Sequence, residues 1–358
     1  MSSKYFHKVK VKDISKTTED CSVITLDIPE EIREQFKFKA GQYLTLEANI
    51  DGEEVRRSYS LCSSPLDNEW QVGIKKIVDG KFSTYANDVL AVGDELSVMA
   101  PNGHFHVDID QDAERNYVAF AAGSGITPVI SIIKTQLSAE PKSSFKLFYV
   151  NKTVGSIIMK EELESLKNQF MDRLEIFYFL TKQKRTISFL NGRLDEDKLD
   201  VIFENICSIE ETDHYFSCGP EPMILMIRDY LKAKGVDDKK IHFELFNTAG
   251  SYQQKTENKA LKKEGKVAEI TIHEGGKSFN FSMIQGSNNI LDEALNNNAD
   301  LPFACKGGVC ATCKAKVLEG KVEMAVHYGL EDDELANGYV LTCQCVPVSE
   351  KVTVDFDI

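Results

Sequence analysis

The first 110 residues of the chain consist of short runs in which hydrophobic and polar side chains alternate. Such runs occupy residues 21–28, 42–46 and 70–75, and turn-forming residues separate them. A period of two places every second side chain on one face, which is typical of half-buried β-strands. Several short strands joined by turns favour an antiparallel barrel or sandwich for residues 1–110.

Residues 111–248 follow a different pattern. Longer apolar runs at 117–122, 145–150 and 174–180 are typical of fully buried strands, and helix-like stretches such as 160–170 lie between them. Strands that alternate with helices form parallel sheets covered on both faces. The pattern therefore predicts a doubly wound parallel sheet, in which ligands bind outside the carboxyl ends of the strands.

Residues 249–265 lack hydrophobic periodicity and are rich in small and polar side chains, which predicts an exposed linker. Beyond the linker, two alternating runs at 267–273 and 277–283 flank the turn Glu274-Gly275-Gly276 and predict a strand pair. A helix is predicted at 290–297, and a loop rich in cysteine follows it. We therefore expect three domains, at residues 1–110, 111–248 and 266–358.

Composition and charge limit the classes of partner. Hydrophobic residues make up 42% of the 358 positions, and no apolar run approaches the ~18 residues of a membrane span. The net charge of −14 repels phosphate backbones. Neither a membrane nor a nucleic acid is therefore expected as a partner. The first eight residues show no signal peptide, and nine cysteines are too few for a disulfide scaffold, so we expect reduced thiols in the cytoplasm.

The C-terminal segment is the acidic part of the chain. Residues 265–358 hold fourteen Asp and Glu against seven Lys and no Arg, and they include the acidic run at 331–334. Such a surface can attract a basic redox partner. It can equally serve only to keep the protein in solution, and the sequence leaves both interpretations open.

Four cysteines of this segment follow the spacing C-x4-C-x2-C-x29-C, namely Cys305, Cys310, Cys313 and Cys343. This is the plant-type spacing, in which four thiolates bind a [2Fe–2S] cluster. The glycine pair at 307–308 lets the loop backbone approach the cluster without a Cβ in the way. A structural zinc site more often has two C-x2-C pairs. Cys345, two residues after the last ligand, is expected to be a buried packing thiol.

Two glycine turns follow predicted strands of the middle domain. In the first, Gly123-Ser124-Gly125, the glycines let a pyrophosphate approach the backbone at the start of a helix, where N–H groups favour anions. Alone this pattern is weak, because an ordinary tight turn has the same composition. The second turn, Cys218-Gly219-Pro220, ends another strand and so faces the same edge of the sheet. A buried packing thiol is the alternative interpretation of Cys218.

In the first domain, Arg57 and Tyr59 end one strand-like run, and Ser83 and Thr84 lie at the start of a predicted helix. A guanidinium can bind phosphate through two parallel hydrogen bonds, and a Tyr ring can stack on a planar group. The Ser and Thr hydroxyls can cap the helix and bind a second phosphate. Each residue alone also has an ordinary explanation, a solvated charge beside a packed ring.

The order of these motifs resembles the ferredoxin–NADP reductase superfamily over residues 1–248. The motifs are Arg-x-Tyr-Ser, Gly-x-x-Ser-Thr, Gly-Ser-Gly-Ile-Thr-Pro and Cys-Gly-Pro. With a plant-type ferredoxin fused C-terminally, the chain is similar to the reductase subunits of ring-1,2-phenylacetyl-CoA epoxidases. The resemblance implies a FAD-binding β-barrel, a NADP-binding domain and a β-grasp-like ferredoxin domain. It also implies FAD, a [2Fe–2S] cluster and NADPH as cofactors, with NADH less favoured.

For the flavin, the resemblance implies that Arg57 holds the FAD pyrophosphate together with the helix start at 83–84. Tyr59 would stack on the isoalloxazine ring, and Ser60 would donate a hydrogen bond near flavin N5. Glu244 and Phe246 would end the reductase module close to the flavin. Further expected flavin contacts are Ser58, Lys75, Gly80 and Phe82.

For the nicotinamide nucleotide, the resemblance implies that Cys218 lies beside the C4 atom of the nicotinamide. Ser60, Cys218 and Glu244 are therefore the expected catalytic residues. Further expected contacts to this nucleotide are Gly123, Ser124, Gly125, Thr127, Pro128, Gly219, Pro220 and Met223.

Preference for NADPH needs donors around the adenosine 2′-phosphate. After the predicted strand that ends at residue 180, Thr181 offers a hydroxyl and Lys182 a positive charge, and Lys152 follows an earlier strand. No acidic residue that would prefer a free ribose hydroxyl lies at 181–185. The alternative is a solvated basic loop without a ligand.

Together the implied parts form one electron path, from NADPH through FAD and the [2Fe–2S] cluster to the subunits of a di-iron oxygenase. FAD accepts two electrons at once and releases them singly. One alternative keeps this chemistry and changes the acceptor to another oxygenase or to hybrid-cluster protein. An alternative of a different class is a redox sensor or electron buffer without turnover, and the presence of two nucleotide sites argues against it.

Overall fold

The computed structural model describes residues 4–246 and 265–357, which form two compact units. The first unit is His7–Phe246. The described part of the second unit comprises residues 4–6 and 265–357. The predicted linker at 249–265 lies, except for its last residue, outside the described residues. The predicted division into domains at 1–110, 111–248 and 266–358 stays a prediction.

The N-terminal part of the first unit is a six-stranded sheet with the strand order β4-β3-β6-β1-β2-β5. Its strands are β1 (Phe6–Thr18), β2 (Cys21–Asp27), β3 (Tyr43–Ile50), β4 (Glu53–Ser60), β5 (Trp70–Lys75) and β6 (Glu95–Met99). The pairs β1–β2, β2–β5, β3–β4 and β3–β6 are antiparallel. An antiparallel bridge between Leu61 and Val72 joins the two ends of the sheet, so it closes into the predicted barrel.

Helix α1 (Lys81–Asp88) packs against this barrel. Its Phe82 and Ala86 lie in the barrel core beside Leu44, Leu46 and Val72. Asn87 fixes the helix by donating hydrogen bonds from Nδ2 to the carbonyl oxygens of Ile74 and Ser83, both at 2.9 Å.

The second half of the first unit is the predicted parallel sheet, with the strand order β11-β10-β7-β8-β9. Its strands are β7 (Asn116–Ala122), β8 (Ser144–Asn151), β9 (Leu174–Leu180), β10 (His214–Gly219) and β11 (Ile241–Leu245), and every pair is parallel. Its helices are α2 (Ile126–Ala139), α3 (Lys160–Gln169), α4 (Glu196–Asn205) and α5 (Glu221–Ala233).

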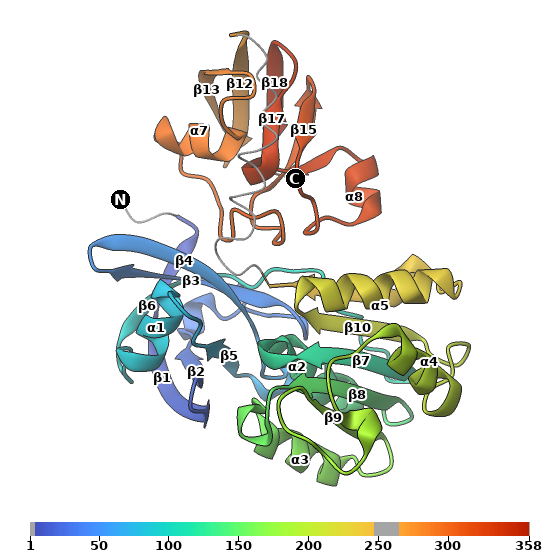
Figure 1. The fold of residues 1–358 in the computed structure, drawn as a ribbon. Helices are drawn as coiled ribbons and strands as arrows, with labels where there is room; N and C mark the ends of the chain where they lie inside the picture. Colours follow the sequence, from blue (N-terminus) through green and yellow to red (C-terminus); the bar gives the residue numbers. More distant parts are fainter. Residues whose placement is uncertain (1–3, 247–264, 358) are drawn as a thin grey trace. The chain divides into compact units, whose positions relative to one another are not determined.

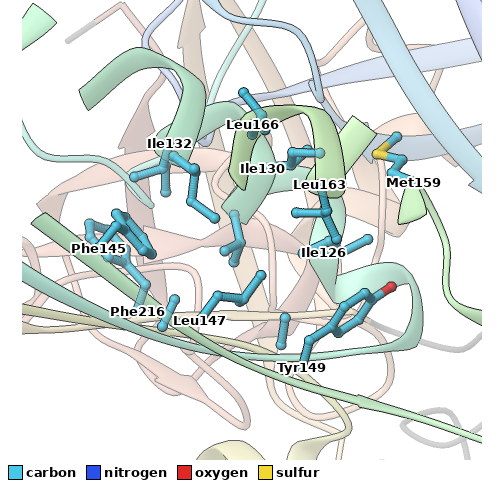
Figure 2. Close-up of a cluster of buried hydrophobic side chains, with 14 of the residues drawn as sticks. Ile126, Ile130, Ile132, Phe145, Leu147, Tyr149, Met159, Leu163, Leu166 and Phe216 are labelled. Atoms are coloured by element: carbon cyan, nitrogen blue, oxygen red, sulfur yellow. The ribbon is translucent and has the colours of Figure 1, made fainter. Parts of the chain in front are cut away.

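Helices lie on both faces of this sheet, which makes the fold doubly wound (Figure 1), and alternating side chains of β7 face different helices. On one face, Tyr117 and Ala119 of β7 pack with residues of α2 and α3, and Figure 2 shows this core around Ile126, Phe145 and Tyr149. On the other face, Val118 and Phe120 pack with residues of α4 and α5.

The barrel and the parallel sheet are joined by direct hydrogen bonds within the first unit. Ser131 of α2 donates from Oγ to the Ser63 carbonyl oxygen at 2.6 Å. Lys134, one turn further along α2, donates from Nζ to the Cys62 carbonyl oxygen at 3.0 Å. Because Cys62 and Ser63 closely follow β4, these bonds fix the end of β4 relative to α2.

The second unit is a mixed five-stranded sheet with the strand order β13-β12-β18-β14-β16. Its strands are β12 (Val267–Glu274), β13 (Lys277–Ile284), β14 (Lys314–Glu319), β16 (Tyr339–Leu341) and β18 (Lys351–Asp355). A separate pair is formed by β15 (Val322–Met324) and β17 (Cys345–Pro347), and the helices are α7 (Ile290–Asn296) and α8 (Asp332–Ala336). This arrangement is the expected β-grasp-like ferredoxin fold.

The predicted hairpin of this unit turns at Gly275 and Gly276, with φ angles of 59° and 68°. Two successive positive φ angles are typical of the tight turns that match strand twist, and glycine adopts them without strain. Asp357 accepts hydrogen bonds from the backbone N–H groups of both glycines, at 2.6 and 2.8 Å.

The N-terminus of the chain contributes to the same region of the second unit. The Lys4 backbone N–H donates to Asp300 Oδ2 at 3.2 Å, and the Lys4 ammonium forms an ion pair with Glu274. The Tyr5 hydroxyl donates to Glu274. Lys4 and Asp357 lie at the two described ends of the chain. Both therefore bind residues in the turn between β12 and β13 or directly beside it.

Short 3-10 helices connect several of these elements: η1 (Glu30–Ile32), η2 (Pro65–Asp67), η3 (Gly123–Gly125), η4 (Val154–Ser156), η5 (Ser188–Leu190), η6 (Asp238–Lys240) and η7 (Thr342–Gln344). Among the described residues, the longest helices are too short or too polar to cross a bilayer.

Candidate functional site

The three residues that the resemblance implies to be catalytic are Ser60, Cys218 and Glu244, and they lie together in the first unit. Ser60 Oγ donates a hydrogen bond of 2.8 Å to Glu244 Oε2, although 184 positions separate the two residues. In the sheet register Cys218 of β10 is the direct partner of Glu244 of β11. The barrel and the carboxyl edge of the parallel sheet therefore meet at these three side chains.

The local sequence explains this meeting. Ser60 is the last residue of β4, and Cys218 and Glu244 lie near the carboxyl ends of parallel neighbours. Gly125 allows the first glycine turn to approach β10, because a Cβ at this position would lie 2.1 Å from the Cys218 carbonyl oxygen. The two glycine turns predicted from the sequence are thus in contact at one edge of the sheet.

Burial governs the electrostatics of this junction. It raises the pKa of the Glu244 carboxyl to about 7, although the hydrogen bond from Ser60 favours the ionised form. Burial, with the nearby Glu244 charge, also raises the pKa of the Cys218 thiol well above its usual range. Cys218 is therefore a neutral thiol, while the Ser60–Glu244 pair can hold or release a proton near neutral pH.

The first glycine turn has the geometry of a phosphate-binding loop. Gly123 has a φ angle of 55°, and a Cβ added there would meet no described atom within 4 Å, so the space beside the backbone is open. Helix α2 begins at Ile126, and its first N–H groups have no partner within the helix. The Ile126 N–H itself donates within η3 to the carbonyl oxygens of Gly123 and Ser124. A pyrophosphate fits this position, because the helix dipole favours an anion beside the open backbone at Gly123.

Tyr149 supports this turn and was not identified from the sequence. Its ring is fully buried in β8, and its hydroxyl donates to the Gly123 carbonyl oxygen at 2.9 Å (Figure 2). Thr127 Oγ1 donates to the Ser124 carbonyl oxygen at 3.0 Å. The only signal in the sequence was a Tyr at the end of a buried strand, where its hydroxyl needs a partner.

On the barrel, Arg57 and Tyr59 share one face of β4, because strand side chains alternate. The rings of Tyr59 and Phe82 have centroids 5.5 Å apart, which joins β4 to the start of α1. The Arg57 guanidinium donates to the Arg56 carbonyl oxygen at 2.6 Å. Ser58 points to the opposite face, where its hydroxyl forms a 3.1 Å hydrogen bond with Thr45 Oγ1.

The start of α1 differs from the expectation in one respect. Its N-cap residue is Gly80, which has no side chain to cap the helix, so the expected capping by Ser83 and Thr84 is wrong. Ser83 lies within the first turn, where its Oγ donates to the Gly80 carbonyl oxygen at 3.2 Å and accepts from the Ile77 N–H at 3.3 Å. Its hydroxyl therefore closes the loop before the helix, and the free N–H groups remain for an anion.

The remaining predicted contacts are placed as follows. Lys75 forms an ion pair of 3.5 Å with Asp20. Phe246 is partly buried against the core that contains Cys218.

The predicted 2′-phosphate residues follow β8 and β9. The Thr181 N–H donates to the Asn151 carbonyl oxygen at 2.9 Å, and the Lys182 N–H donates to the Lys152 carbonyl oxygen at 2.8 Å. These bonds bring the predicted residues together. Met223 packs against the core on the α4–α5 face, next to Pro220, the N-cap of α5.

In the second unit the four predicted ligands form two pairs. Cys305 interacts with Cys310, and Cys313 interacts with Cys343. The hydrogen bond from Cys310, helped by N–H groups of residues 307, 309 and 310, lowers the pKa of the Cys305 thiol to about 6 despite burial. The Gly307 N–H lies 3.3 Å from Cys305 Sγ. The loop thus presents donors to a sulfur that carries negative charge.

Two pairs of thiols suit a centre with two iron atoms, because each iron takes two protein ligands and two bridging sulfides. A single metal ion needs one convergent set, and no group of three or more His, Cys, Asp or Glu converges in this way among the described residues. Cys345 is fully buried and pairs with Met324 across the small sheet, as expected of a packing thiol.

Comparisons with known proteins assign a different cofactor-binding domain to each of three parts of the chain. An oxidoreductase FAD-binding domain model matches residues 8–107, an oxidoreductase NAD-binding domain model matches residues 120–229, and a 2Fe-2S iron-sulfur cluster binding domain model matches residues 272–348. The chain thus contains sites for FAD, a pyridine nucleotide and a [2Fe–2S] cluster, and it is an oxidoreductase.

Among characterised relatives, the E subunit of 1,2-phenylacetyl-CoA epoxidase from Escherichia coli K12 is 42% identical over 98% of both chains. The ferredoxin reductase component of 3-ketosteroid-9-alpha-monooxygenase from Rhodococcus rhodochrous is 31% identical over 97% of this chain and 95% of the relative. In fold, the chain is similar to phthalate dioxygenase reductase, with a TM-score of 0.59 and 24% identity over 98% of both chains. The chain therefore belongs to the family of modular FAD, NAD(P)H and [2Fe–2S] reductases that includes the reductase of the 1,2-phenylacetyl-CoA epoxidase.

Proposed function

We propose that this protein transfers electrons from NADPH to the di-iron oxygenase that epoxidises the ring of phenylacetyl-CoA. The reductase activity is supported above all by the junction of Ser60, Glu244 and Cys218, where the FAD-binding barrel meets the nucleotide-binding edge of the sheet. The acceptor is inferred from the 42% identity to the epoxidase component, which spans all three cofactor-binding domains.

Each part of the chain has a distinct task in this proposal. Bound FAD supplies the change from two-electron to one-electron chemistry. Arg57 and the N–H groups at the start of α1 bind its pyrophosphate, and Tyr59 covers its ring system. The Ser60–Glu244 pair holds a proton beside the reacting edge of the flavin. Cys218 and the turn at Gly123 orient the nicotinamide nucleotide against that edge.

The main alternative keeps this chemistry and changes the acceptor. The ketosteroid monooxygenase component, at 31% identity, indicates that this domain order also serves another oxygenase. Hybrid-cluster protein is a further candidate acceptor of the same class. A redox sensor without turnover is less well supported, since the junction provides catalytic groups as well as binding groups. None of the nine cysteines, all of which lie in the described residues, forms a disulfide, which supports our proposal of a cytoplasmic location.

The function is tested by steady-state assays with purified candidate oxygenases. The holoprotein is expected to reduce ferricyanide with NADPH and to support epoxidation of phenylacetyl-CoA by the matching di-iron oxygenase. Absence of ferricyanide reduction would contradict the reductase activity itself. Ferricyanide reduction without support of that oxygenase would retain the reductase and reject the proposed acceptor.

Flavin binding should depend on Arg57. Its replacement by alanine removes a charged hydrogen-bond partner of the pyrophosphate, a loss on the order of 1.5–3 kcal/mol. We expect Arg57→Ala to purify with substoichiometric FAD, measured by flavin absorbance per protein. Arg33→Ala is the control, because Arg33 lies in the same barrel and donates to the Ile28 carbonyl oxygen, at 3.1 Å. Equal flavin occupancy in both variants at low FAD concentration would reject the role of Arg57.

Selection of NADPH should depend on Lys182. The charge of this exposed lysine, beside Thr181 and Lys152, attracts the 2′-phosphate that NADH lacks. We expect the parent protein to prefer NADPH, and Lys182→Ala to raise KM for NADPH with little change for NADH. Lys142→Ala, which removes an exposed charge before β8 instead of after it, is the control. Equal kcat/KM for both nucleotides in the parent protein would contradict this proposal.

A further inference from the structure

Gln344 occupies an unusual position in the second unit. It follows the ligand Cys343 in η7 and is only 7% exposed. A buried amide is favourable only when its polar atoms have partners. The partners of Gln344 lie on both segments that carry the cluster ligands.

The amide nitrogen of Gln344 makes three contacts. Nε2 donates to the carbonyl oxygens of Lys306 and Cys343, both at 3.0 Å. It also lies 3.6 Å from Cys343 Sγ, within the range of a hydrogen bond to sulfur, and since the amide group has only two hydrogens, this contact shares one of them with a carbonyl oxygen. The opposite orientation of the amide would place its oxygen against two carbonyl oxygens, so these contacts fix the nitrogen on the side of the cysteines.

Packing holds the same side chain against the cysteine loop. A Cβ added to Gly308 would lie 2.9 Å from Gln344 Cγ and 2.8 Å from the Val326 carbonyl oxygen. Lys306, whose carbonyl accepts from Gln344, has a φ angle of 50°, which is uncommon for a residue other than glycine. Gln344 therefore stabilises a constrained turn between Cys305 and Gly307.

The Gln344 amide also retains one unused polar atom. Oε1 is buried and has no hydrogen-bond partner within the part of the chain that the structure describes. An unpaired buried carbonyl oxygen costs about 1–3 kcal/mol. A hydrophobic side chain of equal size would avoid this cost, but it would remove the Nε2 donor from the carbonyl oxygens of Lys306 and Cys343 and from the Cys343 sulfur.

We propose that Gln344 is a positioning residue that raises the reduction potential of the [2Fe–2S] cluster. A donor directed at a ligand sulfur stabilises the more negative, reduced state more than the oxidised state, because one electron is added without a proton. The amide thereby favours transfer of a single electron from the flavin to the cluster. The proposal rests on the cluster assigned to this unit and does not depend on the identity of the acceptor.

The test replaces Gln344 by methionine, which has similar length and no donor, in the full holoprotein. Redox titration followed by electron paramagnetic resonance should show a more negative cluster potential and an unchanged flavin potential. We expect the equilibrium constant for transfer of one electron from the flavin to the cluster to fall up to tenfold. This corresponds to a cluster potential that is lower by up to about 59 mV. Gln285→Met is the matched control, since Gln285 is a buried glutamine of the same unit that donates to the Ser349 carbonyl oxygen at 3.0 Å.

An unchanged potential in a fully loaded Gln344→Met variant would overturn the proposal. A second measurement covers the case in which that variant fails to load its cluster. In the unaltered protein, labelling of the glutamine side-chain amide nitrogen should give a hyperfine coupling to the reduced cluster, and this coupling should persist in Gln285→Met. Absence of the coupling would equally overturn the proposal.

Discussion

Replacement of Cys343 by serine is expected to abolish the [2Fe–2S] absorption while reduction of the flavin by NADPH continues. Cys343 forms one of the two thiol pairs with Cys313, and a two-iron centre needs both pairs. The flavin and nicotinamide sites belong to the other compact unit, His7–Phe246, which has its own hydrophobic cores. Visible spectra and anaerobic stopped-flow reduction would measure the two effects separately.

The same variant should still reduce ferricyanide and should no longer reduce an oxygenase. Cys345→Ser is the control, because this thiol is fully buried only two residues away and lies opposite Met324 in the small sheet. It should keep its cluster. A cluster that survives in Cys343→Ser and disappears in Cys345→Ser would reverse the ligand assignment.

Replacement of Glu244 by glutamine is expected to slow reduction of the flavin by NADPH about 10²-fold, the size of effect found for a positioned acid or base. Glutamine can accept the hydrogen bond from Ser60 Oγ, so the geometry is retained while the titrating group is lost. In the parent enzyme the rate of flavin reduction should change with pH around a midpoint near 7, because burial raises the pKa of Glu244 to about 7. The rate in the variant should not show this change.

The same substitution should make the protein more stable at alkaline pH. A folded-state pKa raised from 4.5 to about 7 means that stability is greatest below pH 4.5 and is lost as pH rises through 7. At about 1.36 kcal/mol per pKa unit, the full effect is about 3 kcal/mol, and partial solvent access lowers it. Thermal unfolding should therefore show a higher Tm for Glu244→Gln at pH 8 and no difference at pH 4.

Glu34→Gln provides the matched control for both measurements. Glu34 is exposed and forms an ion pair with Lys37, at 2.7 Å. Its replacement should change neither the rate of flavin reduction nor the pH dependence of Tm. If the stability of Glu244→Gln falls at pH 8, the raised pKa of Glu244 is not a property of the folded protein.

Elements with strong local signals could be predicted from the sequence. The strands at 70–75 and 174–180 have the predicted bounds, since alternation and continuous apolar runs are local properties. The turn at Gly275 and Gly276 was also predicted, because two adjacent glycines suit two positive φ angles. The cysteine spacing predicted a [2Fe–2S] cluster, which the domain comparison confirms, and the assignment of the four ligands stays a prediction.

Contacts between distant segments could not be predicted in the same way. Nothing in the sequence near Ser60 indicates a carboxylate 184 positions away, and only the resemblance placed both residues at the flavin. The roles of Tyr149 and Gln344 depend on which backbone carbonyls the fold brings within reach. The prediction that Ser83 caps the helix was wrong. Helix α1 begins at Lys81, two residues before Ser83, so the Ser83 hydroxyl lies inside the first turn.

The position of the two chain ends has a consequence for the order of domains in such proteins. Lys4 and Asp357 both bind at the β12–β13 turn, Lys4 through Glu274 and Asp357 through Gly275 and Gly276. A short peptide joining the two described ends would allow the chain to be opened after Phe246, the last residue of the first unit. The resulting circular permutant would carry the ferredoxin first and the flavoprotein second, with every hydrogen bond described above intact. The fold within each unit therefore does not depend on which unit comes first along the chain.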